Sequence, residues 1–598
     1  MGMGATNITG RIIASLYQGG SAIVAFRPAI DVPNGGVLLA LPALLATGLL
    51  AHAEQFFRIP ARYYGLDSIL LLLAFMALAR VKSIESLRNC PPGEWGKLLG
   101  LDRIPEVRTL REKLAKITLE NKVTEWMTQL WSQWMADVKG VLAAFYIDGH
   151  VRVYYGEQTK LPRHYVARQK LCLRATTDYW INARDGQPLL VINKPVDPGL
   201  LKVLEHDIVP RLEKEIPPAT LEEVAKNPNF HRFSLIFDRE GYSPQFLLAM
   251  KQRHIACLTY HKHQDADWPE EEFTLCQVRT VGSNTVEMRL AERGLWLSKK
   301  LWLREIRKLS DGGHQTSIIT TDYVATMEEI APTMFARWSQ ENFFKYMREN
   351  YNLDSLIDYK TSSVPETTQV VNPQYRNVSS EIRKKTTILN RTLANFGSVN
   401  LDGDITPEKV TEYQQKKANL QEKIAQYQAD IGKLKIDRKA FPTHISFSAL
   451  PEEDQFKQLS IQSKHLIDTI KMIAYRVETA MVQILREITS QQDCARKLVT
   501  GVYDTEIDLV PDENEKTLTV FLHHLPSHSS DKSVQHLCEE LTKTETIFPG
   551  TNFRLIYKLG SAQNPVVGYI NFKSQKLSLR AKRSNRILHF EIASLRSQ

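Results

Sequence analysis

The chain has 598 residues, which is too long for one hydrophobic core, and three or four domains are expected. Its 43% hydrophobic and 24% charged residues are ordinary for a globular protein. The net charge of +9 permits a polyanionic partner without demanding one, because phosphate binding depends on how Lys and Arg cluster. Six scattered cysteines without paired spacing favour a reducing compartment and exclude a disulfide framework.

Two strongly apolar segments, residues 36–53 and 68–79, lie near the N-terminus. The first contains Pro42, and the second is a dozen residues long, whereas a membrane span needs about 20. No basic region of the kind that opens a signal peptide precedes them. Both are therefore predicted to be buried helices of an N-terminal helical domain, residues 1–135, in a protein with no membrane partner.

Residues 83–117 have the outline of a helix-turn-helix. One short helix is predicted to end at Cys90, and a second spans residues 94–99 before Gly100 breaks the chain. A third helix follows and carries Arg108 and Arg111, which are candidate DNA contacts. A small helical bundle with no DNA-binding role has the same kind of turns.

From residue 136 onward the pattern changes to strands with interposed helices, which is typical of an α/β domain with a mixed sheet. Residues 171–195 predict one or two strands, residues 197–216 have apolar residues at helical spacing, and residues 232–262 predict a strand, a loop, a helix and a strand. An amphipathic helix is predicted from Ala331 to Asn350. We assign residues 136–264 and 331–352 to one core, and the polar, strand-rich residues 265–330 to an insertion in it.

The C-terminal part is predicted to be helical from residue 375 to 496, with a small α/β cap at 497–560 and a basic, disordered tail at 573–598. The helical part contains a coiled-coil seam that could pair within the chain, with the helix near residues 381–396, or between chains. Spacings of three and four residues define the seam, and Lys417 is its one polar member: Val410, Tyr413, Lys417, Leu420, Ile424, Tyr427, Ile431 and Leu434.

The stretch "VLAAFYIDGHVRVYYG", residues 141–156, has strand-forming residues on both sides of Asp148 and Gly149. An Asp-Gly pair in this context predicts a tight β-hairpin. Asp148 can therefore be a turn residue, or it can be a metal ligand at the end of a core strand.

Two further acidic residues occupy positions comparable to that of Asp148. Asp238 follows the apolar run "FSLIF", and sites in α/β folds lie at the carboxyl ends of strands. Glu341 lies on the predicted 331–350 helix, where Arg337, Glu341 and Arg348 fall within roughly 40° of one another at about 100° per residue.

Carboxylates at Asp148, Asp238 and Glu341 suit Mg²⁺ or Mn²⁺, which prefer hard oxygen ligands. Two such ions about 4 Å apart can drive an in-line displacement at phosphorus. Arg337, Lys345 and Arg348 are then candidates for holding DNA phosphates. For each acid alone, a turn, a cap or a surface charge is the simpler explanation.

The chain resembles the bacterial insertion-sequence transposases that carry a DDE triad on an RNase H-like fold. The resemblance runs from "GVLLALPALLATGLL" to "FPGTNFRLIYKL" and is densest at "YIDGHVRVYYG", "FDREGYSPQFL" and "RWSQENFFKYM". The last of these is similar to a Glu motif of the form Tyr-x2-Arg-x3-Glu-x6-Lys, with Met334 in place of the Tyr. That replacement puts a hairpin-forming pathway in doubt more than catalysis.

The resemblance implies that Asp148, Asp238 and Glu341 are the catalytic, metal-binding residues, with two Mg²⁺ or Mn²⁺ ions. It also implies an RNase H-like core, a DNA-binding β insertion, and a cytoplasmic, nucleoid-associated protein that forms a homodimer on DNA. The expected activity is cleavage at the inverted repeats of the element and transfer of the 3′ ends to target DNA.

Two alternatives remain open: a metal-dependent nuclease without strand transfer, and a catalytically inactive, transposase-derived DNA-binding protein. A zinc site at Cys257, His261, His263 and Cys276 is disfavoured, because these residues do not form two Cys/His pairs.

Overall fold

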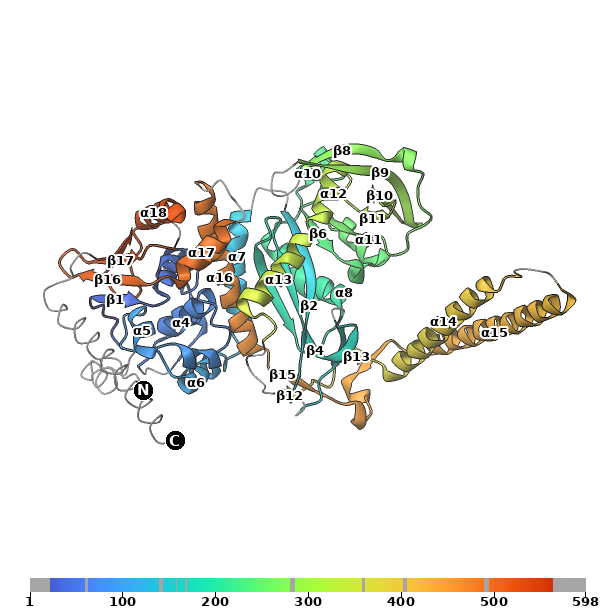
Figure 1. The fold of residues 1–598 in the computed structure, drawn as a ribbon, viewed down its shortest axis with the longest axis horizontal. Helices are drawn as coiled ribbons and strands as arrows, with labels where there is room; N and C mark the ends of the chain where they lie inside the picture. Colours follow the sequence, from blue (N-terminus) through green and yellow to red (C-terminus); the bar gives the residue numbers. More distant parts are fainter. Residues whose placement is uncertain are drawn as a thin grey trace, which may run out of the picture.

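The structure is a computed structural model that describes residues 22–59, 63–138, 143–156, 159–166, 169–279, 285–355, 357, 361–401, 406–488, 494–526 and 528–562. It has a helical body built from both ends of the chain, a large mixed sheet beside it, a lobe of long strands, and a projecting helical arm (Figure 1). The predicted multidomain α/β class is confirmed. The basic tail at 573–598 lies outside the described residues.

The large sheet has ten strands. Five of them form its centre, in the order β5-β4-β2-β6-β7. Strand β2 pairs antiparallel with β4 and parallel with β6, β4 pairs antiparallel with β5, and β6 pairs parallel with β7. The bounds are β2 Ala143–Val153, β3 Arg163–Val166, β4 Leu171–Asn182, β5 Pro188–Lys194, β6 Phe233–Phe237 and β7 Ile255–Tyr260.

Short helices connect and cover these strands. The predicted helix at 197–216 is present as α8 Leu200–Val203, a π-helical turn at Leu204–Ile208 and α9 Val209–Glu215. It is followed by α10 Leu221–Lys226, the 3₁₀ turn Arg239–Gly241 and α11 Pro244–Gln252. The predicted order of strand, loop, helix and strand across residues 232–262 is therefore confirmed.

The predicted strand-rich insertion extends the same sheet. Strands β8 Thr274–Arg279, β9 Thr285–Ser298, β10 Leu301–Leu309 and β11 Gln315–Thr320 continue it in the order β7-β11-β10-β9-β8, with antiparallel pairing throughout. Figure 1 shows these strands curling away as a lobe. The insertion is thus held to the core by backbone hydrogen bonds between β7 and β11.

Both ends of the chain form the helical body together. Strand β1 Ala29–Val32 pairs antiparallel with β16 Ile507–Asp512, and β17 Thr517–Leu522 and β18 Arg554–Leu559 complete a four-stranded sheet. The N-terminal region and the C-terminal cap, two units in the sequence prediction, therefore share one sheet. The helices of these regions are η1 Gly35–Ala40, α2 Leu41–Ala46, α3 Ala53–Phe56, α4 Leu66–Leu78, η2 Glu85–Asn89, α5 Pro92–Lys97, α6 Val107–Ile117, α7 Val123–Val138, α17 Ala495–Asp504 and α18 His528–Lys543.

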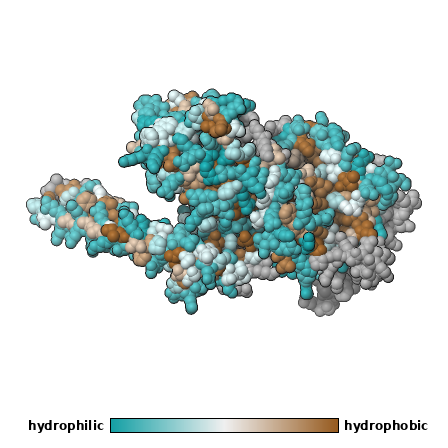
Figure 2. All heavy atoms as spheres, turned by 180° about the vertical axis from the view of Figure 1, so that it is seen from behind, coloured by the Kyte–Doolittle hydropathy of each residue, from teal (hydrophilic) through white to brown (hydrophobic). Residues whose placement is uncertain are grey.

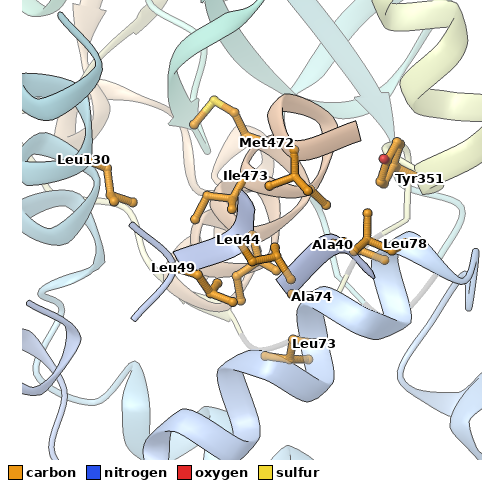
Figure 3. Close-up of a cluster of buried hydrophobic side chains, with 14 of the residues drawn as sticks. Ala40, Leu44, Leu49, Leu73, Ala74, Leu78, Leu130, Tyr351, Met472 and Ile473 are labelled. Carbon is orange, nitrogen blue, oxygen red and sulfur yellow. The ribbon is translucent and has the colours of Figure 1, made fainter. Parts of the chain in front are cut away.

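The two apolar N-terminal segments are buried, as predicted. Eleven of the 13 residues of α4 are buried. They pack with α2, α7 and the 25-residue helix α16 Gln462–Arg486 around one apolar cluster, to which Tyr351 contributes from α13 Trp338–Tyr351 (Figure 3). In the part of the chain that the structure describes, no helix combines the length and hydropathy needed to cross a membrane.

Helix α16 also carries a fully buried carboxylate, Glu478, that joins four elements. Arg80 after α4 donates to it at 2.6 Å, Arg496 of α17 at 2.8 Å and Tyr351 of α13 at 2.6 Å, and Tyr346 of α13 is a further donor. The two arginines hold the pKa of Glu478 below its ordinary value although burial alone would raise it. This cluster fixes α13 against both ends of the chain.

The predicted coiled-coil seam pairs within the chain. Helices α14 Pro373–Ser398 and α15 Pro407–Ala440 form an antiparallel arm that projects from the body (Figure 1). All members of the seam are partly or fully buried, and the other partly buried residues of α15 are Asp430 and Arg438. Its polar member, Lys417, donates to the carbonyl of Phe396 at the end of α14 and lies 4.0 Å from the centre of the Phe396 ring. The lysine thus caps the partner helix, so the seam itself is not free to join two chains.

The arm stands on two small antiparallel pairs. One pair is β13 Gln369–Val371 with β14 His444–Ser446, and the other is β12 Thr361–Ser363 with β15 Lys457–Leu459. Short 3₁₀ turns at Phe447–Ala449 and Glu452–Asp454 connect β14 to β15. These pairs bring the chain back to the start of α16.

We predict that Glu478→Gln destabilises the protein by about 3–5 kcal/mol, because Arg80 and Arg496 lose their buried counter-charge. Thermal unfolding followed by circular dichroism measures the change. The matched control is Glu487→Gln, at the exposed end of the same helix, which should leave the melting temperature within a degree or so. Equal melting temperatures for the two variants would contradict the prediction.

Candidate active site

Asp148 lies in the middle of β2, so the predicted hairpin at residues 141–156 is wrong. Strand β2 runs unbroken from Ala143 to Val153 and pairs with β4 through Asp148↔Trp180 and Gly149↔Tyr179. A Cβ at Gly149 would lie 3.2 Å from the Tyr179 ring, so this glycine makes room for a ring and does not form a turn. The Asp148 carboxylate accepts the N–H of Gly149 at 2.9 Å without reversing the chain.

Asp238 lies directly beyond the last paired residue of β6. The parallel ladder between β2 and β6 ends at Ile147↔Phe237, so the next residue on each strand is an aspartate. Asp238 caps the 3₁₀ turn that follows, accepting the N–H of Arg239 at 2.7 Å. The register of two adjacent parallel strands therefore places Asp148 and Asp238 side by side.

The helix predicted from Ala331 to Asn350 is two helices, which corrects that prediction. Helix α12 Met327–Phe335 ends before Ala336, and α13 begins at Trp338, with Arg337 as its N-cap residue. Tyr146 of β2 donates to the carbonyl of Thr333 in α12 at 2.9 Å. Contacts of this kind to the sheet on each side of the break outweigh the helix propensity of the local sequence.

Arg337 connects the helix to the strand aspartate. Its guanidinium donates to Asp148 at 3.3 Å and to Glu341, one turn into α13, at 3.2 Å. It also lies 5.7 Å from the centre of the Tyr260 ring at the end of β7. The arginine side chain is 11% exposed and that of Glu341 is 49% exposed, so the site opens to solvent on the glutamate side.

Gln340 anchors α13 to the sheet, and no sequence pattern identified it. This residue is buried, and its amide donates to the carbonyls of Tyr146 and Trp180 and to the side chain of Asn182, at 3.1–3.2 Å. In the sequence, the one signal that could have identified Gln340 is its position directly before Glu341, the proposed catalytic glutamate. Its bonds set the position of Glu341 relative to β2.

His150 supports the same helix from two residues beyond Asp148. Its Nε2 lies 2.6 Å from an Asp354 carboxylate oxygen, and its ring stacks on Phe344 of α13 with ring centres 5.1 Å apart. His150 is buried, whereas the Asp354 side chain is 43% exposed. Both ends of α13 are thus held to the strand that carries Asp148.

The electrostatics of the site concentrate on Asp148. Burial raises the pKa of its carboxyl to about 7; Arg337 and the N–H of Gly149 oppose this shift, and Asp238 and Glu240 add to it. Burial, Asp197 and Asp238 raise the pKa of Glu240 in turn. Arg337 therefore compensates only part of the negative charge in this region. A bound cation would stabilise the ionised carboxylates of such a region.

The oxygens of Asp148, Asp238 and Glu341 do not all lie within 4.8 Å of one another. Among the described residues, that spacing is met by one group, Asp31, Asp508 and His523. Asp508 already accepts the backbone N–H groups of Asp31 and Ala562, at 3.0 and 2.9 Å, and lies 2.9 Å from His523, so this group is a hydrogen-bonded tie between the chain ends. The four residues weighed for zinc do not meet this spacing.

The predicted DNA contacts are of two kinds. Lys345 is exposed on α13, and Arg348 donates to the carbonyl of Phe344 in the same helix at 3.4 Å. Arg108 and Arg111 lie on α6 with side chains 90% and 56% exposed, and they form ion pairs with Glu112 and Glu85. Both sets are accessible, but only Arg337 touches the carboxylates of the site.

A pocket of about 540 Å³ lies beside the loop that follows Asp238. It is formed between the core and β9, and its lining includes aromatic, basic and apolar groups: Tyr242, Pro244, His261, Lys262, His263, Asp265, Leu295, Trp296 and Leu297. The rings of Tyr242 and His261 stack with centres 6.2 Å apart. Strand β9 of the lobe therefore shares this pocket with Tyr242 and Pro244, which follow Asp238 in the chain.

Residues 2–561 match the model of a protein family described as "Transposase protein". The match covers nearly the whole chain, and the chain belongs to this transposase family. Comparison with curated proteins gives no match.

We predict that Asp148→Asn stabilises the protein at pH 8 by roughly 3 kcal/mol. The folded protein binds the Asp148 proton more tightly than the unfolded chain, because its pKa of about 7 exceeds the ordinary 3.8. The stabilisation that protonation of Asp148 gives is complete at pH values below the ordinary pKa of 3.8, and it is lost as the pH rises through 7.

Melting temperatures of wild type and variant between about pH 4 and pH 8 test this. The advantage of Asp148→Asn should vanish at the acidic end, and Glu349→Gln, an exposed change on α13, should show no pH-dependent difference. An advantage that is independent of pH would refute the assignment.

Proposed function

We propose that the protein is a DDE transposase of a bacterial insertion sequence, with Asp148, Asp238 and Glu341 as its catalytic carboxylates. The observation that carries the proposal is the register of β2 and β6, which sets two aspartates side by side, together with the Arg337 bridge from Asp148 to Glu341. Membership of a transposase family supports the same assignment.

The five central strands support an RNase H-like core for this enzyme. Three antiparallel strands, β5, β4 and β2, are followed by the parallel strands β6 and β7. Both aspartates lie at the end of the parallel part, which is where α/β sheets carry their sites. The lobe of strands β8–β11 then corresponds to the β insertion of the resembling transposases.

The donor set suits two Mg²⁺ or Mn²⁺ ions. Three carboxylates are hard oxygen ligands, and burial, with smaller contributions from Asp238 and Glu240, raises the pKa of Asp148, so a bound cation would stabilise its ionised form. Asp148 would bridge both ions, with Asp238 and Glu341 each holding one. Bound there, such ions would activate a water or a 3′-hydroxyl and stabilise the leaving oxygen.

The protein's own side chains orient the substrate and the carboxylates. Arg337 holds Asp148 and Glu341 in place, and its guanidinium is the proposed contact to a phosphate oxygen on the open, glutamate side of the site. Lys345 and Arg348 extend this positive edge along α13. Gln340 and His150 keep α13 at a fixed distance from β2.

The substrates are the terminal inverted repeats of the element and the target DNA, held by a homodimer. Arg108 and Arg111 on α6 are the proposed contacts to the repeats, and their exposure supports this role. A protein that works on chromosomal DNA is expected at the nucleoid, in the bacterial cytoplasm. A nuclease without strand transfer and an inactive DNA-binding derivative remain the alternatives, and the cleavage experiment separates them.

We predict Mg²⁺-dependent cleavage of labelled element ends, followed by joining of the 3′ ends to a target duplex. Asp148→Ala and Glu341→Ala should lower both steps at least 1,000-fold, because loss of an ion ligand removes stabilisation of charge in the transition state. Glu349→Gln, on the same helix, should keep full activity. Cleavage without joining identifies the nuclease, and end binding without cleavage identifies the inactive derivative.

We also predict that millimolar Mg²⁺ at pH 8 raises the melting temperature of the wild type, because a ligand that binds only the folded state stabilises it. The shift should be lost in Asp148→Asn and retained in Glu349→Gln. Differential scanning fluorimetry without DNA measures it. An equal shift in Asp148→Asn would place the bound ion elsewhere.

A further inference from the structure

The projecting arm has two dissimilar outer faces. Along α14 the partly or fully buried residues Tyr375, Val378, Ile382, Leu389 and Phe396 face α15, and the cations Arg376, Arg383 and Arg391 are exposed. At about 100° per residue, these three arginines lie within roughly 80° of one another on the side away from α15. They form one stripe, which we call the arginine stripe.

The arginine stripe is chemically uniform. On the outward side, Ser380 and Thr387 lie between the arginines, and Ala394 and Ser398 follow Arg391; all four are small or carry hydroxyl groups. None of the three arginines takes part in an ion pair with another described residue, whereas the neighbouring Lys384 pairs with Glu381 at 3.0 Å. Unpaired guanidinium groups with hydroxyls between them form a surface for phosphate oxygens.

The other helix lacks such a stripe. The outward positions of α15 carry alanine and glutamine and charges of both signs: Gln415, Ala418, Glu422, Ala425, Ala429 and Lys433. Two cations of the arm interior are used within the arm: Lys385 of α14 donates to Asp430 of α15, and Lys417 of α15 donates to the Phe396 carbonyl of α14. The exposed positive charge of the arm is therefore concentrated on the outer face of α14.

The spacing of the stripe suits a nucleic-acid backbone. At 1.5 Å per residue, Arg376 and Arg391 are about 22 Å apart along α14, which is more than half a turn of B-DNA. The two large apolar side chains that α14 exposes, Ile388 and Leu393, lie on opposite sides of the stripe at about 60–80° from its nearest arginine, so they form no single apolar anchor for a protein partner. Charge complementarity therefore favours DNA over a second copy of the chain.

The arm is also placed where DNA can reach it. It projects from the body, with α14 on the side that faces the lobe of strands β8–β11 in Figure 1. The space-filling view shows an open notch between the lobe and the arm (Figure 2). A duplex in that notch would run along the stripe.

We propose that the arginine stripe of α14 binds the phosphate backbone of double-stranded DNA without sequence preference, at a surface separate from α6 and from the acidic site. This inference rests on the proposed function, because it assigns part of the DNA contact of a transposase to the arm. The arm then adds affinity to DNA of any sequence, including target DNA.

The test is equilibrium binding of the full-length protein to a random-sequence 30-base-pair duplex at several salt concentrations. The variant is Arg376→Gln, Arg383→Gln and Arg391→Gln together, which keeps a good helix-forming side chain at each position. We expect its Kd to rise at least tenfold. The slope of log K against log salt should fall in magnitude by about 3, because three phosphate contacts are lost.

The matched control has the same charge change on α15: Lys416→Gln, Lys423→Gln and Lys433→Gln, at three exposed positions. It should change Kd less than threefold and leave the salt slope unchanged. Equal effects of the two triple variants would show that net charge alone matters and would overturn the proposal. Thermal unfolding should be the same for both proteins and the wild type.

Two other outcomes are decisive. If the arginine variant binds DNA normally but loses self-association in sedimentation, the stripe is a contact between copies and the proposal is wrong. If the arginine variant binds normally and cleaves element ends normally, the arm inference fails while the proposed function stands. A wild type that binds no DNA would overturn both.

Discussion

The arrangement of this protein depends on one buried carboxylate. Glu478 on α16 is fully buried and accepts hydrogen bonds from Arg80, Arg496, Tyr346 and Tyr351, which come from both ends of the chain and from α13. A buried charge without these partners would cost several kcal/mol, so the elements that supply them must stay together. Because α13 also carries Glu341, the same cluster that joins the chain ends fixes the glutamate of the site.

The acidic site depends on that fixed helix. Asp148 and Asp238 are placed by strand register, which backbone hydrogen bonds determine, whereas Glu341 is positioned relative to them by the packing of α13 on β2. Arg337 then balances part of the negative charge, and burial together with the neighbouring acids keeps the pKa of Asp148 near 7. Local backbone geometry and long-range packing therefore contribute different members of the same site.

Several features of the sequence were open to more than one interpretation, and long-range contacts decided between them. The Asp148–Gly149 pair is a good turn signal, but β4 offers a full ladder and Tyr179 needs the space at Gly149. Lys417 interrupts an apolar seam, but it caps α14 through the Phe396 carbonyl. The 331–350 helix has helical periodicity throughout, but Gln340 and Tyr146 hold its two parts at different places on the sheet.

The sequence by itself determined the α/β class, the buried apolar helices, the strands at 171–195 and 232–262, the strand-rich insertion, and the seam of the arm, because hydrophobic periodicity and turn residues act locally. It also marked Asp148, Asp238 and Glu341, through their positions beside apolar runs and through a family resemblance. Only the tertiary structure decided that β1 joins the sheet of the C-terminal cap, that the insertion extends the core sheet, and that Gln340 and Glu478 hold the helix that carries Glu341. Those features depend on partners that are distant in the chain, and no local pattern in a single sequence records such pairs.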